Sequence, residues 1–227
     1  MKVLVTDGLE AEALARVKGH HEVDVIETSP AQLLEVVGNY DAVIVRGRTE
    51  VSADVIFRGT KLRVIARAGV GVDNIDVAAA TKHRIPVVNA PAASTISVAE
   101  LTIAHMLSLA RHIPQADRSM KAGRWDKKAF EGTELYGKTL GLVGSGRIGA
   151  EVASRARSFG MRVIAYDPYL PPRVAEERGI ELTTLEAVLL DADFVSVHAA
   201  LTDETRHMIG AKQLALMKQE TDGTPSR

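Results

Sequence analysis

The chain contains no cysteine. This absence excludes disulfide bonds, thiolate nucleophiles and metal sites with sulfur ligands, and it is compatible with a reducing cytosol. Aromatic residues make up only 4% of the 227 residues, and the formal net charge is −1. A nearly neutral chain has no electrostatic field that gathers nucleic acid or an anionic membrane surface, so we expect neither as a partner.

Long apolar runs are also missing. No stretch approaches the length that crosses a bilayer, and residues 1–6 read as a first strand rather than as a signal peptide. We therefore expect a cytoplasmic protein. A hydrophobic content of 46% over 227 residues is enough for two domains with separate cores.

The first 90 residues alternate short β-branched runs with segments of helical spacing. Such alternation predicts a parallel sheet covered on both faces and joined by right-handed crossovers. Ligands of such a sheet lie beyond the carboxyl ends of its strands, where the sequence places Asp7, Arg46, Gly47, Arg48, Arg67 and Asn89. The strands are expected at 2–6, 23–27, 41–46, 63–66 and 86–89, and the helices at 10–18, 30–37, 52–57 and 74–82.

A long apolar helix is expected to follow the first domain. Ser97 and Glu100 have the spacing of a capping box, so we expect the helix to begin there. These patterns give residues 1–96 as the first domain, 97–134 as a linker helix and contact region, and 135–218 as the second domain. The expected apolar face of the helix consists of Val98, Leu101, Ile103, Leu107 and Ala110.

Three glycines mark the start of the second domain. Gly144, Gly146 and Gly149 lie between an apolar strand and a segment with helical spacing over residues 147–159. Gly144 would permit a tight turn, Gly146 would let the backbone approach a pyrophosphate, and Gly149 would let the helix pack close to its strand. The free N–H groups near Arg147 and Ile148 would then face the phosphates of a dinucleotide. The alternative is a turn and helix without a ligand.

An acidic residue refines the prediction of a dinucleotide site. Asp167 ends the next apolar strand and precedes Pro168. A carboxylate at this point can accept both ribose hydroxyls of NAD and would repel the 2′-phosphate of NADP. Asp167 can also open a turn with Pro168, and that role is compatible with the first.

Several segments together resemble the D-2-hydroxyacid dehydrogenases. The resemblance implies a flavodoxin-like substrate domain followed by a Rossmann NAD-binding domain, incomplete here, in an α/β protein. It also implies NAD as the cofactor, with Val98, His198 and Thr205 beside it, and a homodimer formed through the helix from Ser97 and the region of Trp125. The segments are 66–76, 88–91, 97–100, 111–116, 121–125, 130–140, 142–149, 166–169 and 198–205.

The resemblance implies the NAD-dependent oxidation of a secondary alcohol next to a carboxylate. We expect 3-phospho-D-glycerate as the substrate and 3-phosphohydroxypyruvate as the product, in serine biosynthesis. Two alternatives stay open: a glyoxylate or hydroxypyruvate reductase, and a non-catalytic NAD-binding module that dimerises. The residues implied at the substrate are Arg46, Arg67, Gly69, Val70, Gly71 and Asn74.

The histidines give no metal site and no catalytic base. His20 and His21 are adjacent but have no third ligand at metal spacing, so no metal is expected. His198 ends a strand at the expected cofactor site, where a histidine is more often structural. In the family the catalytic histidine lies further along the chain, so we do not assign the base to His198.

The family pattern stops after Lys218. Family members continue with an apolar strand that ends in an arginine, followed by the glutamate and histidine of the acid–base pair. Residues 219–227 are polar and turn-forming instead. We therefore expect a C-terminal truncation, no catalytic residue within the chain, negligible turnover, and a disordered tail. We also expect residues 194–197 to form a long apolar sheet edge.

Overall fold

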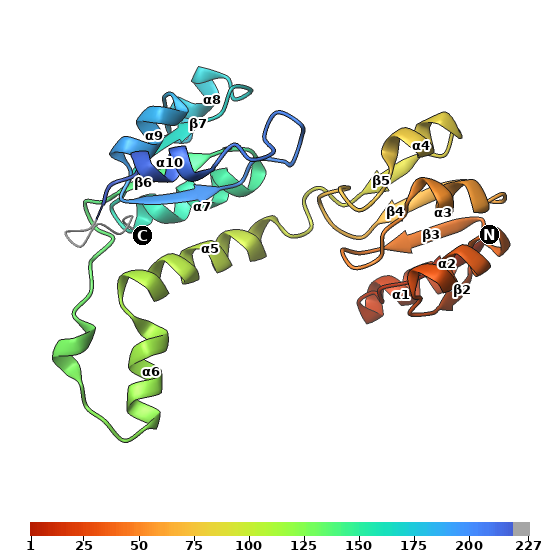
Figure 1. Ribbon diagram of the computed structural model, residues 1–227, viewed down its shortest axis with the longest axis horizontal. Coiled ribbons are helices and arrows are strands. Elements are labelled where there is room, and N and C mark those ends of the chain that lie inside the picture. The colour runs from red at the N-terminus through yellow and green to blue at the C-terminus, as the bar shows by residue number, and fades with distance from the viewer. Residues whose placement is uncertain (220–227) are drawn as a thin grey trace. The chain divides into compact units, whose positions relative to one another are not determined.

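The computed structural model describes residues 1–219, which belong to two compact units that divide between Ser94 and Thr95. Both units consist of a parallel sheet with helices, which confirms the predicted α/β class (Figure 1). The first unit contains β1 (Lys2–Val5), α1 (Ala11–Lys18), β2 (Glu22–Val25), α2 (Pro30–Val36), η1 (Val37–Asn39), β3 (Ala42–Val45), α3 (Ala53–Arg58), β4 (Val64–Arg67), α4 (Val77–Lys82) and β5 (Val87–Asn89).

The first sheet has the strand order β2-β1-β3-β4-β5. On one face, Leu33 of α2, Ile56 of α3 and Ala80 of α4 pack in a buried cluster with strand residues. On the other face, α1 is the one helix among the described residues that packs on the strands. The predicted cover on both faces is therefore only partly correct, because a single helix cannot span five strands and leaves Val88 49% exposed.

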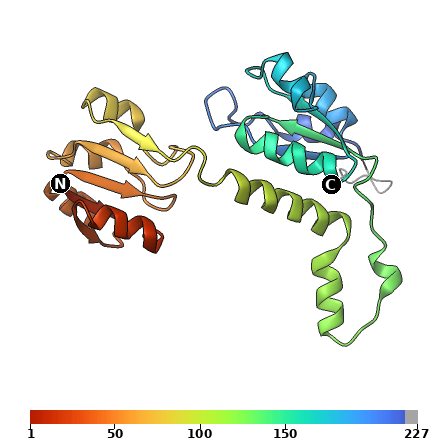
Figure 2. The same cartoon turned by 180° about the vertical axis from the view of Figure 1, so that it is seen from behind.

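The second unit has a parallel sheet with the strand order β8-β7-β6-β9. Its core joins the sheet to α5 and α7, which lie side by side (Figure 2). The strand β9 covers the expected residues 194–197 and lies at the edge of the sheet in the described part of the chain, as predicted. The elements are α5 (Thr95–Ala110), α6 (Ile113–Lys121), η2 (Lys127–Phe130), β6 (Thr139–Val143), α7 (Arg147–Ser158), β7 (Arg162–Tyr166), α8 (Pro172–Glu177), β8 (Glu181–Leu182), α9 (Leu185–Asp191), β9 (Phe194–Val197) and α10 (Ala211–Leu216).

The helix α5 differs from the prediction in two ways. It begins at Thr95, so Ser97 lies inside the helix and the predicted capping box with Glu100 is wrong. Leu101, expected on the buried face, is 56% exposed. The buried residues of the helix are Thr95, Ala99, Ile103, Met106 and Ala110. Ile103 and Ala110 lie on the buried face as expected, and Ala99 and Met106 join them where α5 packs with α7 and the sheet.

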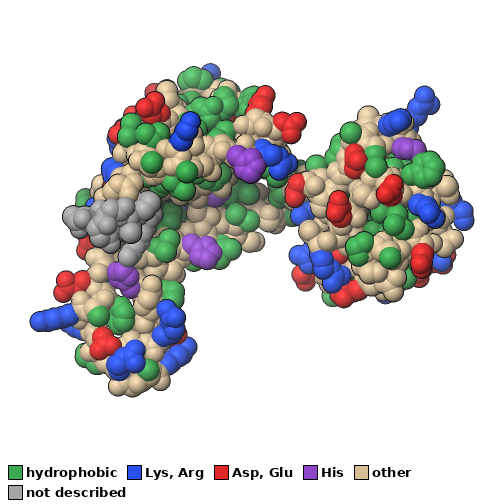
Figure 3. All heavy atoms as spheres, viewed as in Figure 1, with side chains coloured by type: hydrophobic (Ala, Val, Ile, Leu, Met, Phe, Trp, Pro, Cys, Tyr) green, Lys and Arg blue, Asp and Glu red, His purple; other side chains and the backbone are tan. Residues whose placement is uncertain are grey.

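The helix α6 was not predicted from the sequence. It follows His112, whose φ of +52° breaks the direction of α5. On α6 and η2, Lys and Arg side chains lie next to apolar ones (Figure 3). The apolar side chains Ile113, Met120 and Trp125 are exposed, Trp125 to 77%.

Among residues 1–219, no helix is both long and apolar enough to cross a membrane. The expected disorder of the tail concerns residues 219–227, of which all but the first lie outside the described residues.

Candidate functional site

A cavity of about 440 Å³ lies at the carboxyl ends of β6, β7 and β9. Parallel strands bring these ends to one edge of the sheet, where ligands of such folds bind. The volume lies within the usual range for small-molecule sites. The cavity is lined by Val143, Gly144, Gly146, Tyr166, Asp167, Pro168, Tyr169, His198, Ala199, Ala200, Thr202, Glu204, Thr205 and Met208.

Glycine is suited to each of the three positions for a different structural reason. Gly144 has a φ of +88°, and a Cβ there would lie 2.7 Å from the backbone nitrogen of Ala199. A Cβ on Gly149 would lie 2.5 Å from the carbonyl oxygen of Gly144, so this glycine lets α7 pack against the turn. Gly146 has a φ of −64°, and a Cβ there would meet no heavy atom within 4 Å. The protein therefore leaves open space in front of Gly146, as a site for a pyrophosphate requires.

Asp167 connects two loops at the mouth of the cavity. Its Oδ2 accepts hydrogen bonds from the backbone N–H of Ser145 at 2.8 Å and from the Ser145 hydroxyl at 3.3 Å, and its Oδ1 accepts from the N–H of Tyr169 at 3.0 Å. From the other side, the guanidinium of Arg178 donates to the carbonyl oxygen of Ser145 at 3.2 Å. The carboxylate thus organises its own turn and keeps acceptor capacity on Oδ1 for a ribose hydroxyl.

His198 and Thr205 both line the cavity. The His198 Nε2 and the Ser196 Oγ are hydrogen bonded at 2.9 Å. Burial lowers the pKa of His198 below its ordinary value, so the imidazole is neutral at pH 7. The Thr205 hydroxyl donates to the carbonyl oxygen of Ala200 at 2.6 Å and accepts from the N–H of Thr202 at 2.8 Å. Thr205 therefore shapes the loop that borders the cavity.

Four expected cofactor residues do not line this cavity. Arg147 is exposed at the start of α7, and Ile148 packs partly buried against the core. Gly149 lies under the turn, and Val98 lies on α5. The side chains of Arg147, Ile148 and Val98 are thus outside the lining, and Gly149 acts through packing.

Eight of the lining residues were missed from the sequence, and two of them, Tyr169 and Glu204, interact with each other. The Tyr169 hydroxyl donates to the Glu204 Oε2 at 3.2 Å and so joins the loop after β7 to the loop after β9. The negative charge of Glu204 raises the pKa of Tyr169. The position of Glu204 just after β9 was the available signal, because the ends of β6, β7 and β9 meet at one edge.

In the first unit, side-chain amides hold the loops expected to bind the substrate. The Asn74 Nδ2 donates to the carbonyl oxygens of Arg46 at 2.8 Å and of Thr49 at 2.6 Å. The Asn89 Nδ2 donates to the carbonyl oxygen of Val70 at 2.6 Å, and so fixes the loop that contains Gly69 and Gly71. Asn89 was expected only as a strand-end residue, and its contact with Val70 shows what it does.

Arg67 lies over this same loop. A Cβ on Gly69 would fall 1.2 Å from a terminal nitrogen of Arg67, so only glycine leaves room for the guanidinium. The Nε of Arg67 is buried without a hydrogen-bond partner in the part of the chain that the structure describes. A buried cationic donor without a partner is costly, which makes Arg67 a candidate to bind an anion.

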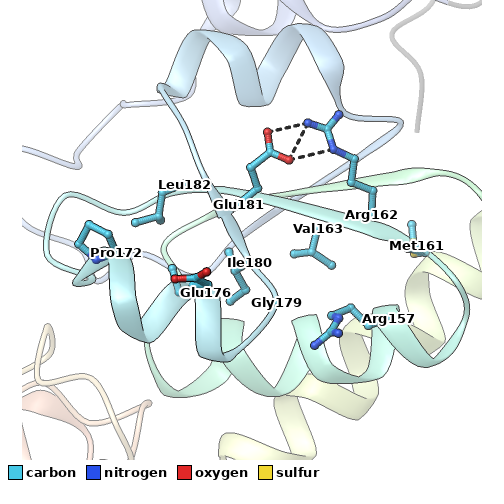
Figure 4. Close-up of a pocket in the computed structure, with 11 residues that line it drawn as sticks. Arg157, Met161, Arg162, Val163, Pro172, Glu176, Gly179, Ile180, Glu181 and Leu182 are labelled. Atoms are coloured by element: carbon cyan, nitrogen blue, oxygen red, sulfur yellow. Dashed lines mark hydrogen bonds and ion pairs between the residues drawn. The ribbon is translucent and has the colours of Figure 1, made fainter.

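Residues 1–219 contain no cluster of three or more His, Asp or Glu side chains that could hold a metal ion. A second hollow, of about 590 Å³, lies beside β7, β8 and α8 (Figure 4). Its two arginines are already engaged, since Arg162 forms an ion pair with Glu181 at 2.7 Å and Arg157 donates to the carbonyl oxygen of Arg178 at 3.1 Å. We therefore do not assign a ligand to this hollow.

Residues 103–221 match the family model described as D-isomer specific 2-hydroxyacid dehydrogenase, NAD binding domain. The chain belongs to this family. The matched segment contains the whole glycine turn and Asp167, and the cofactor of this domain is NAD. The resemblance inferred from the motifs is thereby confirmed.

The alignments with relatives of this dehydrogenase family member extend over both units. A D-3-phosphoglycerate dehydrogenase from Methanocaldococcus jannaschii is 53% identical over 96% of this chain and 42% of its own length. A hydroxypyruvate reductase from Thermotoga maritima is 45% identical over 96% of this chain and 71% of its own length. The chain thus spans about two fifths of the length of the first relative and over two thirds of the second.

Solved structures give the same fold. A D-lactate dehydrogenase from Aquifex aeolicus, complexed with NAD and lactic acid, has a TM-score of 0.87 and 28% identity over 96% of this chain and 66% of its own. A protein from Thermus thermophilus has a TM-score of 0.87 and 37% identity, with coverage of 96% of this chain and 71% of its own.

Proposed function

We propose that this chain binds NAD in its second unit and a phosphorylated 2-hydroxy acid in its first unit, as part of a D-3-phosphoglycerate dehydrogenase of serine biosynthesis. The reaction is the oxidation of 3-phospho-D-glycerate to 3-phosphohydroxypyruvate. The observation that carries the proposal is the turn from Gly144 to Gly149 with Asp167 beside it, in a chain 53% identical to a D-3-phosphoglycerate dehydrogenase.

In the second unit, different residues bind different parts of the cofactor. The N–H groups at the start of α7 bind the pyrophosphate, and Asp167 accepts the ribose hydroxyls. Pro168 and Thr205 shape the two bordering loops, and His198 contributes a neutral ring. When bound, NAD supplies the acceptor for the hydride that leaves the carbon bearing the hydroxyl.

In the first unit, the substrate is anionic at both ends and needs cations and N–H donors. Arg46 and Arg67 supply the cations, and the backbone of Gly69, Val70 and Gly71 supplies N–H groups. The Arg46 side chain is exposed and forms no hydrogen bond or ion pair within residues 1–219, so it is available.

We expect this chain alone to turn over its substrate slowly. The described part of the cavity lining contains one histidine, and His198 is already hydrogen bonded to Ser196. Loss of a general base costs about 10² to 10⁴ in rate. Oxidation at the rate of an ordinary dehydrogenase would show that a group of this chain acts as the base.

Equilibrium titrations of the purified chain test the proposal. We expect NAD to bind more tightly than NADP, and 3-phospho-D-glycerate more tightly than glycerate or D-lactate. Equal binding of NAD and NADP would contradict the assignment of Asp167. Equal binding of the three acids would contradict the choice of a phosphorylated substrate.

A second candidate is a hydroxypyruvate reductase. The Thermotoga maritima relative of that name favours it, because this chain covers 71% of its length. Preference for unphosphorylated hydroxypyruvate in the same titrations would support this candidate over the first.

The chain is also proposed to form a homodimer through α5, α6 and the segment around Trp125. Leu101, Ile113, Met120 and Trp125 are exposed there, Leu101 to 56% and Met120 to 53%. Apolar side chains gathered in one region mark interaction surfaces, and homodimers are the commonest assembly. Sedimentation of the wild type and of Trp125→Glu, with Tyr169→Glu as an exposed control outside this region, tests the assignment.

A further inference from the structure

The topology of the first unit predicts a ligand beside Arg46, one of the residues expected at the substrate. In the order β2-β1-β3-β4-β5, the chain leaves β1 toward β2 on one side, and β3 lies on the other. The loops after β1 and β3 therefore diverge, and ligands of such sheets bind in the crevice between them. In this chain the two diverging loops contain Asp7, which follows β1, and residues 46–49, which follow β3.

The Asp7 carboxylate joins these two loops. Its Oδ2 accepts from the N–H of Arg46 at 2.7 Å and from the N–H of Thr49 at 3.1 Å, and its Oδ1 accepts from the Thr49 hydroxyl. The Nε of Arg48 lies 3.5 Å from Oδ1. The Asp7 side chain is only 4% exposed. The N–H groups and the hydroxyl that could bind an anionic ligand therefore bind the Asp7 carboxylate instead.

The two arginines of this loop consequently differ. Arg48 is held by Asp7, by Glu27 at 3.3 Å and by the carbonyl oxygen of Thr6 at 3.2 Å. Arg46 contributes only backbone groups to the network, since its N–H binds Asp7 and its carbonyl oxygen accepts from Asn74. Its guanidinium is left for a ligand.

We infer that Asp7 is a positioning residue that fixes the loop 46–49 so that Arg46 binds the anionic substrate. This inference rests on the proposed function. Asp7 does not touch the substrate, because its oxygens are occupied by the loop. It acts from the β1 side, and Asn74 braces the same loop from the β4 side.

The charge of Asp7 is needed for this role. Burial alone would raise the pKa of Asp7, but the hydrogen bonds from Thr49, from the backbone N–H of Arg46 and from Arg48 lower it below the ordinary value. The carboxylate is therefore ionised at neutral pH and accepts from all its donors.

The test compares Asp7→Asn with Asp76→Asn in the full chain. Asp76 caps α4 by accepting from the N–H of Ala79 at 2.8 Å, so its substitution also costs a carboxylate hydrogen bond in the same unit. We expect Asp7→Asn to weaken binding of 3-phospho-D-glycerate about tenfold, and Asp76→Asn to leave it unchanged. NAD affinity should stay the same in both variants.

Amide hydrogen exchange provides a readout that does not depend on the substrate. We expect the amides of Arg46 and Thr49 to exchange about tenfold faster in Asp7→Asn than in the wild type or Asp76→Asn. Unchanged exchange at these two amides would overturn the inference. If exchange rises as expected but substrate affinity does not fall, Asp7 orders the loop without positioning Arg46, and the inference is also wrong.

Failure of the proposed function looks different. In that case the wild type itself binds no 3-phospho-D-glycerate, and the affinity comparison is repeated with inorganic phosphate. Asp7→Asn is then expected to weaken phosphate binding, and phosphate binding equal to the wild type overturns the inference.

Discussion

Single residues at the cavity serve both the fold and the ligand. Asp167 accepts hydrogen bonds from the backbone of Ser145 and Tyr169 and also lines the cavity. A substitution that keeps the shape of the Asp167 side chain can therefore separate the effect of its charge on the ligand from its effect on the conformation of the turn.

We predict that Asp167→Asn lowers NAD affinity and raises NADP affinity. Hydrogen bonds to a charged group contribute about 1.5–3 kcal/mol, which corresponds to about a 10- to 100-fold loss for NAD. Calorimetric titration with each nucleotide checks this prediction. Asp203→Asn is the control, because Asp203 is exposed and does not line the cavity. An unchanged ratio of the two affinities would show that Asp167 does not select the cofactor.

The partly buried His198 predicts a pH dependence of stability. Because burial lowers its pKa in the folded state, the unfolded state takes up a proton first as the pH falls. The contribution of His198 to stability is thus complete above pH about 6.5, the unfolded value, and decreases below it. Urea unfolding at pH 7.5 and 5.5 should show a smaller loss for His198→Gln than for the wild type. The exposed His20→Gln should behave like the wild type.

At the scale of elements, the turn between β6 and α7 combines a packing requirement with an open surface. Gly149 is buried against the turn, whereas Gly146 faces open space. Adding a Cβ should therefore reduce stability at Gly149 and ligand binding at Gly146.

We predict that Gly149→Ala destabilises the second unit by about 1–3 kcal/mol, because its Cβ would overlap the carbonyl oxygen of Gly144. Gly146→Ala should leave the free energy of unfolding within about 0.5 kcal/mol of the wild type and still weaken NAD binding. Denaturant unfolding and NAD titration of both variants check this. If Gly146→Ala bound NAD as well as the wild type, the pyrophosphate would not approach that glycine.

At the scale of the whole molecule, the chain has two compact units with separate cores. A ligand that binds one unit stabilises that unit by its own binding free energy. The protection of backbone amides from hydrogen exchange, compared between the two units, therefore shows which unit binds NAD.

We predict that NAD at about 100 times its Kd stabilises the second unit by about 2.7 kcal/mol. Amide exchange should slow at core residues such as Leu142 and Val163, and should not change at Val43 and Ile65 of the first unit. Equal protection of both units would contradict an NAD site confined to the second.

Much of the fold was predictable from local patterns. The alternation of β-branched and helical segments predicted the parallel sheet of the first unit, because period and burial are properties of neighbouring residues, and the resemblance of the motifs implied the second sheet. The start of α5 was not predicted, and its buried face was predicted only in part: Ile103 and Ala110 are buried as expected, whereas Leu101 is exposed and Ala99 and Met106 were missed. The helix α6 was missed because its sequence is mostly polar and follows a change of direction at His112.

The sequence by itself determined the glycine turn, the carboxylate after the next strand and the family to which they belong. These features depend on backbone conformation and on the spacing of residues close together in the chain. Only the tertiary structure decided that Arg48 is engaged while the Arg46 side chain has no partner among residues 1–219, and that Asp7 binds the loop 46–49. The physical reason is distance along the chain: Asp7 and Arg46 are 39 residues apart, and folding alone brings their hydrogen-bonding groups together.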